Sequence, residues 1–323
     1  MRSFAAVTGD RHFIRRLRRA FMFAAASLLA LFPDVAITQG RHLELEELFA
    51  RTLPAEFELA GASVRDSTSI LLWARNQRHL LLQRGDSLWS IASEEITHPV
   101  AAALVVGDTI VEVVDVARRT ILEVRLDGSL VKERPVGTDL FVETAVRTES
   151  GWVFGGTSPD GTYMVVRAGE DLTATVLYTF NAAVGPTYTP VSTLLSTDGQ
   201  RIFIAEVEEP FRALVVDPDG TVAAWPPRTS PRADESGIGG APHWVALPIV
   251  ALDSDFVQTF ADLRSDLRSL NLYDADGTPL REQRIQLPLA VVASIPGSNR
   301  LVAARRTNVL EVVVYNWSWS VSH

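Results

Sequence analysis

Hydrophobic and polar positions alternate through most of the chain after residue 58. Runs such as residues 109–116, 120–126 and 129–136 follow this pattern, which is typical of β-strands with one buried face. Neighbouring runs are joined by short turns at Asp127-Gly128, Asp219-Gly220 and Asp276-Gly277. Asp-Gly is favoured in tight hairpin turns because both residues tolerate positive φ angles. The pattern therefore predicts a meander of antiparallel strands.

The predicted strands fall into six similar groups of four. We expect the turn between the third and fourth strand of each group near residues 86, 127, 170, 219, 276 and 316, at intervals of 40 to 57 residues. Four strands at such a period are typical of a propeller blade. The fold class predicted is all-β, a six-bladed β-propeller of four-stranded antiparallel blades. Residues 56–60 or residues 318–322 would supply the outer strand of the last blade, and residues 43–51 are compatible with a short helix.

Two turns carry a further resemblance. Ser158-Pro159-Asp160-Gly161 and Ser196-Thr197-Asp198-Gly199 each precede a hydrophobic run, and they resemble strand turns of bacterial exported six-bladed propellers with TolB-like or NHL-type repeats. The resemblance covers most of residues 59–323 and implies the propeller fold. No catalytic constellation of those families is matched in this chain.

The N-terminus has the pattern of an export signal. Five arginines between residues 11 and 19 precede an apolar stretch, residues 20–32, which Pro33 ends. The stretch is shorter than the roughly 20 residues of a membrane-spanning helix, which disfavours an uncleaved anchor. We expect a signal peptide (residues 1–38), a lead-in segment (residues 39–58), a propeller domain (residues 59–323) and a periplasmic or secreted location. Membrane contact is expected only through the signal before cleavage.

Composition narrows the possible partners. The chain has no cysteine, which excludes disulfides and thiolate sites. Its formal net charge is −9, and residues 1–38 carry six arginines and two aspartates, so that the chain without them stands at −13. Nucleic-acid binding requires clustered positive charge, so we expect no nucleic-acid partner. Lys132 is the only lysine, which makes arginine the default cation of this protein.

Groups that could perform chemistry are sparse. The turns around Asp217 and Asp274 lack the ligand set of a calcium loop. Asp253, Asp255, Asp262 and Asp266 are interpreted as a solvated strand edge rather than as paired catalytic acids. No histidine has metal-ligand spacing, so we expect neither a metal nor a cofactor. His243-Trp244 follows a long loop, residues 228–241, and is expected near one mouth of the propeller channel.

Arginines recur at the junctions between the second and third strands. They include Arg75, Arg118, Arg264, Arg268 and Arg305. Because these junctions share one face of a propeller, a ring of guanidinium groups would favour an anionic partner, such as a protein surface, an acidic glycan or a small molecule. The alternative interpretation is that turns carry the chain's only common cation. We expect a monomer.

The function predicted from these patterns is an exported, non-catalytic propeller that acts as a ligand-binding or protein-interaction scaffold. The alternative is a propeller enzyme, a hydrolase or lyase, with its site at the mouth of the central channel. A channel lined by apolar and small residues would favour the binding role.

Overall fold

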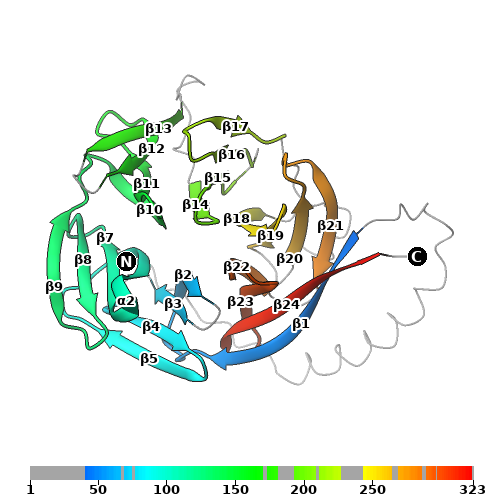
Figure 1. Ribbon diagram of the computed structural model, residues 1–323, viewed down its shortest axis with the longest axis horizontal. Coiled ribbons are helices and arrows are strands. Elements are labelled where there is room, and N and C mark those ends of the chain that lie inside the picture. The colour runs from blue at the N-terminus through cyan, green and yellow to red at the C-terminus, as the bar shows by residue number, and fades with distance from the viewer. Residues whose placement is uncertain are drawn as a thin grey trace, which may run out of the picture. The chain divides into compact units, whose positions relative to one another are not determined.

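The computed structural model describes most of the chain from residue 41 to residue 321. The described ranges are 41–66, 69–74, 77–169, 173–180, 193–208, 211–226, 243–263, 268–285, 289–295 and 297–321. These residues form six four-stranded antiparallel sheets arranged in a ring around a central axis, with one four-residue helix, α2 (Val106–Thr109) (Figure 1). The predicted six-bladed propeller is confirmed. The predicted signal segment, residues 1–38, lies outside the described residues.

Each of the first five blades is built from four consecutive strands, from the channel outward. Blade 1 comprises β2 (Leu59–Asp66), β3 (Ser69–Ala74), β4 (His79–Arg84) and β5 (Ser87–Ala92). Blade 2 comprises β6 (Pro99–Val105), β7 (Ile110–Asp115), β8 (Thr120–Arg125) and β9 (Leu130–Pro135). Blade 3 comprises β10 (Phe141–Thr148), β11 (Gly151–Thr157), β12 (Tyr163–Ala168) and β13 (Ala174–Phe180). Blade 4 comprises β14 (Thr193–Thr197), β15 (Ile202–Glu206), β16 (Ala213–Val216) and β17 (Val222–Ala224). Blade 5 comprises β18 (Trp244–Leu252), β19 (Asp255–Asp262), β20 (Arg268–Tyr273) and β21 (Pro279–Ile285).

Blade 6 is closed by the two ends of the described chain. Its strands are β22 (Leu289–Ile295), β23 (Arg300–Arg306), β24 (Leu310–Val321) and, on the outside, β1 (Arg41–Thr52). The helix predicted over residues 43–51 is therefore wrong, because this segment pairs with β24 along its whole length. Neither predicted closing segment supplies the outer strand. Asn316, where we expected a turn, lies within β24 opposite Arg300.

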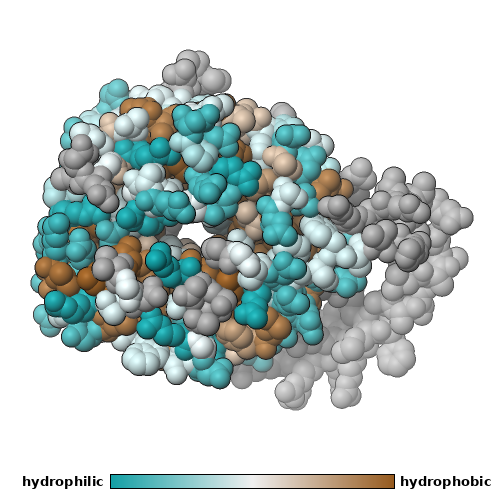
Figure 2. Space-filling view, viewed as in Figure 1, coloured by the Kyte–Doolittle hydropathy of each residue, from teal (hydrophilic) through white to brown (hydrophobic). Residues whose placement is uncertain are grey.

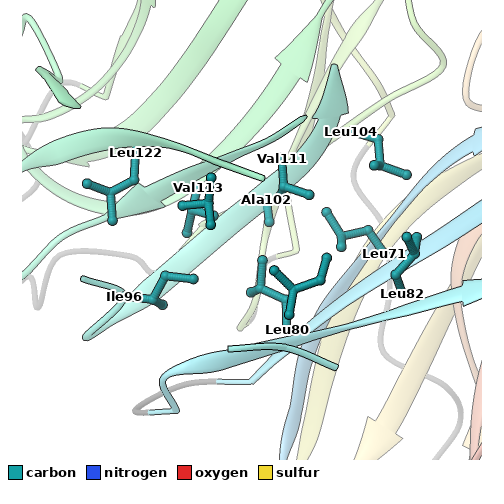
Figure 3. Close-up of a cluster of buried hydrophobic side chains, with 11 residues drawn as sticks. Leu71, Leu80, Leu82, Ile96, Ala102, Leu104, Val111, Val113 and Leu122 are labelled. Carbon is teal, nitrogen blue, oxygen red and sulfur yellow. The ribbon is translucent and has the colours of Figure 1, made fainter. Parts of the chain in front are cut away.

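The hydrophobic core lies between neighbouring blades. Since each sheet stands edge-on to the channel, both faces of its middle strands are buried, and alternating side chains reach the blade before and the blade after. Leu71 and Leu80 of blade 1 thus contact Val111 and Val113 of blade 2 in one cluster (Figure 3). This explains why β19 is buried throughout. Asp255 and Asp262 are buried in it, so that the solvated-edge interpretation is wrong for these two residues.

The connections divide into two faces, which we name by what they carry. The turn face holds the short turns between first and second strands and between third and fourth strands, including the Asp-Gly turns. The crossover face holds the second-to-third junctions and the links between blades. Gly128, Gly220 and Gly277 all have positive φ, as their turns require.

Carboxylates at the ends of two second strands fasten the links between blades. Asp115, fully buried at the end of β7, accepts hydrogen bonds from the backbone of Thr97 at 2.5 Å and His98 at 2.8 Å. Asp262, at the end of β19, accepts one from the backbone of His243 at 2.9 Å. These buried acids therefore serve the fold, because they satisfy backbone donors that the crossovers leave unpaired.

Candidate functional site: the central channel

A cavity of about 1380 Å³ occupies the channel, and it is lined by all six innermost strands. Figure 2 shows its opening at the centre of one face. Most lining side chains are small or apolar. Representative ones are Ala62, Ala102, Ala145, Leu195, Ile249 and Ala293. No histidine is among the described residues that line it.

Bulges in the innermost strands determine what faces the channel. In five of the six strands the register with the second strand shifts, so that extra residues stand without a cross-strand partner. Such a residue takes no part in the pairing of the two strands, and its side chain points in a different direction from that of a paired residue. β2 has a second shift at its turn-face end, where Arg65 is the extra residue and also lines the cavity. The residues at the shifts nearer the crossover face all line the cavity as well: Ala60, Val100, Glu143, Leu247, Pro248 and Val292. We call them the bulge collar. It is apolar except for Glu143.

The bulge of β10 is made possible by two glycines on the neighbouring strand. Val142 is opposite Gly156 and Thr144 is opposite Gly155, which leaves Glu143 as the extra residue. A Cβ on Gly156 would lie 2.2 Å from the carbonyl oxygen of Phe141. Only glycine permits this close backbone approach, so the local sequence fixes the position of the Glu143 carboxylate.

Hydroxyl groups surround Glu143 at this end of the channel. Thr157 donates a hydrogen bond to Glu143 Oε1 at 3.0 Å. Tyr163, opposite Thr157 on the next strand, shares a hydrogen bond with the Thr193 hydroxyl. Burial raises the pKa of Tyr163, with a smaller contribution from the charge of Glu143, so the phenol stays protonated. The arrangement presents one carboxylate among neutral hydroxyl groups.

Four charged side chains line the channel on the crossover face. Glu58 precedes β2 and Glu143 lies in β10, whereas Arg268 begins β20 and Arg306 ends β23. The carboxylates thus belong to blades 1 and 3, and the guanidinium groups belong to blades 5 and 6. Within the described residues, no ion pair is formed by Glu58, Glu143 or Arg306. Arg306 is exposed.

Two of the charged side chains that line the channel on the turn face, Arg147 and Asp198, are held in ion pairs. Arg147 lines the cavity there, and its Nε lies 3.0 Å from Oε2 of the buried Glu112. Glu112 also binds Arg134 at 2.8 Å and accepts the indole N–H of Trp152 at 2.8 Å. Asp198 is paired with Arg201 at 2.8 Å. The Glu112–Arg147 pair therefore joins blades 2 and 3, and the Asp198–Arg201 pair stabilises a single turn.

Two arginines of the predicted ring, and Arg212 at the corresponding junction of blade 4, are neutralised by nearby carboxylates. Arg118 is paired with Glu95 and with Glu133, and its hydrogen bond to Glu133 raises its pKa. Arg305 is paired with Glu47 and with Glu311, which likewise raises its pKa. Arg212 binds the buried Glu206, with N···O 2.6 Å. They share the crossover face, but their charge is largely offset there.

The remaining predicted site residues do not form one site. One lines the cavity, one is buried in the core, one is exposed, and two lie outside the described residues. Arg268 lines the cavity. Trp244 is buried and packs with Phe211 and Phe260, whereas His243 beside it is exposed; neither lines the cavity. Arg75 and Arg264 lie outside the described residues.

Sequence reasoning missed Glu143 and Arg306 as lining residues. The signal for Glu143 was available, since the Gly155-Gly156 pair inside a predicted strand indicates a bulge or a close backbone approach. Arg306 follows Arg305 at the end of β23, and strand alternation sends the two side chains to opposite faces of the strand. Arg305 is paired with Glu311 of β24 and with Glu47 of β1, and β1 is the segment that we expected to form a helix.

Comparison with known proteins supports the propeller fold. No family model matches the chain, and no curated protein does. Among solved structures, it is similar to a catalytically inactive histidine-to-alanine variant of virginiamycin B lyase from Staphylococcus aureus bound to quinupristin (13% identity, 84% of this chain and 99% of that one, TM-score 0.53). It is also similar to a candidate exported protein of Bacteroides fragilis (10% identity, 87% and 96%, TM-score 0.54). A third is a candidate gluconolactonase (13% identity, 92% and 98%, TM-score 0.53). The likeness to these propeller proteins supports the six-bladed fold over most of the chain.

Proposed function

We propose that this protein is an exported, non-catalytic β-propeller that binds a ligand in its central channel. The observation that carries the proposal is the cavity of about 1380 Å³ with its small and apolar lining. Ligand sites are concave, mostly apolar and equipped with a few placed polar groups, and the channel fits this description. The described residues contain no group of three or more acidic or histidine side chains arranged to hold a metal ion.

Export is supported by the N-terminal sequence pattern. One similar structure is a candidate exported protein. As a separate finding, no helix among the described residues is long and apolar enough to span a membrane. We expect the mature chain to begin between Ile37 and Arg41, directly before β1. N-terminal sequencing of protein from the native host tests this. An intact Met1 in the cytoplasmic fraction would contradict it.

Filling the channel tests the binding role. Ala60 belongs to the bulge collar and is exposed, so Ala60→Trp places an indole in the cavity without disturbing the core. Ala223, exposed on the outer strand β17, provides the matched control Ala223→Trp. A panel of peptides, oligosaccharides, amines and carboxylates is screened by thermal shift. We expect compounds that stabilise the wild type and Ala223→Trp but not Ala60→Trp.

The outcome also separates binding from catalysis. NMR of each stabilising compound after incubation with the protein should show it unchanged. Conversion of the compound would favour the hydrolase or lyase alternative. Stabilisation that Ala60→Trp retains would place the ligand elsewhere and overturn the proposal, as would a panel in which no compound stabilises the wild type.

A further inference from the structure

The charges on the crossover mouth are separated by sign across the channel. The innermost strands follow one another around the ring in chain order, so β10 of blade 3 lies across the channel from β22 of blade 6 (Figure 1). Glu143 lies in β10, and Arg306 ends β23, the strand beside β22. The mouth therefore has a negative side and a positive side.

Both charged groups are available to a ligand. Thr157 occupies only one oxygen of Glu143, and Oε2 has no protein partner among the described residues. Arg305 is held by Glu47 and Glu311 on the other face of β23. This leaves the adjacent Arg306, which has no ion pair within the described part of the chain, in the cavity lining.

The space between the two groups is apolar. The remaining members of the bulge collar have no charge, and their side chains surround the mouth. The indole of Trp73 adds aromatic surface, since it lies over Gly61, where a Cβ would be 2.2 Å from the ring. A ligand that spans the mouth thus meets a carboxylate, then apolar surface, then a guanidinium group.

The size of the whole channel cavity leaves room for an extended ligand. Pockets for single small molecules usually measure about 300–1,000 Å³, and this cavity is larger. From these observations we infer that the crossover mouth binds a short peptide with free termini, its ammonium group at Glu143 and its carboxylate at Arg306. This inference rests on the proposed channel-binding function and specifies the ligand class.

The test uses the full chain and alanine peptides of two to six residues. Each peptide is prepared with free termini, with an acetylated N-terminus, with an amidated C-terminus and with both ends blocked, and binding is measured by isothermal titration calorimetry. We expect one length to bind best, and blocking either end to weaken binding about tenfold or more, since a charged hydrogen bond contributes at least the 1.4 kcal/mol that this factor represents.

Matched variants assign each terminus to its residue. Glu143→Gln should abolish the effect of N-terminal acetylation and leave the effect of C-terminal amidation, and Arg306→Gln should do the reverse. Glu149→Gln, at the opposite mouth, and Arg78→Gln, an exposed crossover-face arginine outside the cavity lining, should retain both effects.

The results distinguish failure of the peptide assignment from failure of the channel-binding function on which it rests. Equal binding of free and blocked peptides, no peptide binding, or equal losses in the control variants would overturn the peptide assignment. If another compound class then binds in a manner sensitive to Ala60→Trp, the channel function stands and only the ligand class is wrong. If nothing binds, both fail.

Discussion

The two mouths of the channel are built from the same six strands but use charged residues differently. On the turn face, Arg147 is bound to the buried Glu112, and Asp198 is bound to Arg201. On the crossover face, Glu143 and Arg306 form no ion pair within the described residues, and a bulge places Glu143 in the channel. Buried pairs are costly to break, whereas exposed single charges contribute little to stability. Glu149 and Asp253 also line the turn face without an ion pair among the described residues, so the mouths differ in the buried cluster around Glu112, which maintains the fold on the turn face, and in the bulge that places Glu143 in the channel.

The largest expected effect comes from exchanging two glutamates for glutamine, the buried Glu112 that holds Arg147 on the turn face and Glu143 at the crossover mouth. Glu112→Gln leaves Arg134 and Arg147 facing an uncharged, buried partner, and we expect a loss of about 3 kcal/mol or more in the free energy of unfolding. Glu143→Gln should change it by less than about 0.5 kcal/mol, because that carboxylate is exposed. Urea denaturation of the two variants measures the difference. Similar losses in both would remove the distinction between the mouths.

A smaller effect is expected from two turns that share a sequence but differ in surroundings. Gly277 and Gly220 both follow Asp in third-to-fourth strand turns and both have positive φ. A Cβ on Gly277 would lie 2.2 Å from the ring of Trp225, whereas a Cβ on Gly220 would meet nothing within 4 Å. Gly220→Ala should therefore cost about 1 kcal/mol of backbone strain. Gly277→Ala should cost about 1–3 kcal/mol more, because the indole must move.

Thermal unfolding of the two glycine variants provides the measurement. The melting temperature should fall further for Gly277→Ala than for Gly220→Ala. Equal melting temperatures would mean that Trp225 adapts without cost. Trp225 packs against Phe256 at 5.1 Å and Tyr273 at 5.5 Å between ring centroids, so this adaptation would have to extend into the contact between blades 4 and 5.

The fold could be predicted from the sequence because its signals are local. Alternation and Asp-Gly turns are read within a few residues, and both are repeated from blade to blade. Ring closure could not be predicted in this way, since β1 and β24 are about 270 residues apart in the chain and pair only through tertiary structure. Residues 43–51 combine both periods, since Leu43 and Leu45 alternate as in a strand whereas Leu45, Leu48 and Phe49 have the spacing of a helix.

The candidate site was predicted only in part, for a related reason. The second-to-third strand junctions were correctly assigned to one face, but whether an arginine is neutralised depends on residues far away in sequence. Arg118 is paired with Glu95 and with Glu133, which lie in different connections and strands. The ion pairs and the bulges that define the channel lining arise between strands, and the amino-acid composition does not reveal them.

The smallest expected effect is a pH dependence confined to the turn face. The backbone N–H of Thr221 donates to Asp219 at 2.8 Å, and this hydrogen bond lowers the pKa of Asp219 below its usual value of 3.8. A carboxyl group whose pKa is lower in the folded state stabilises the fold above pH 3.8, and that contribution disappears as the pH falls through the folded-state pKa. The melting temperatures of the wild type and Asp219→Asn should therefore differ at pH 7 and converge as the pH falls through the folded-state pKa of Asp219. Because Asp219 is exposed, the difference should be small, and it should not affect binding at the opposite face. A constant difference across this range would show that the side chain stabilises the turn without its charge, and would assign the role of Asp219 to turn geometry alone.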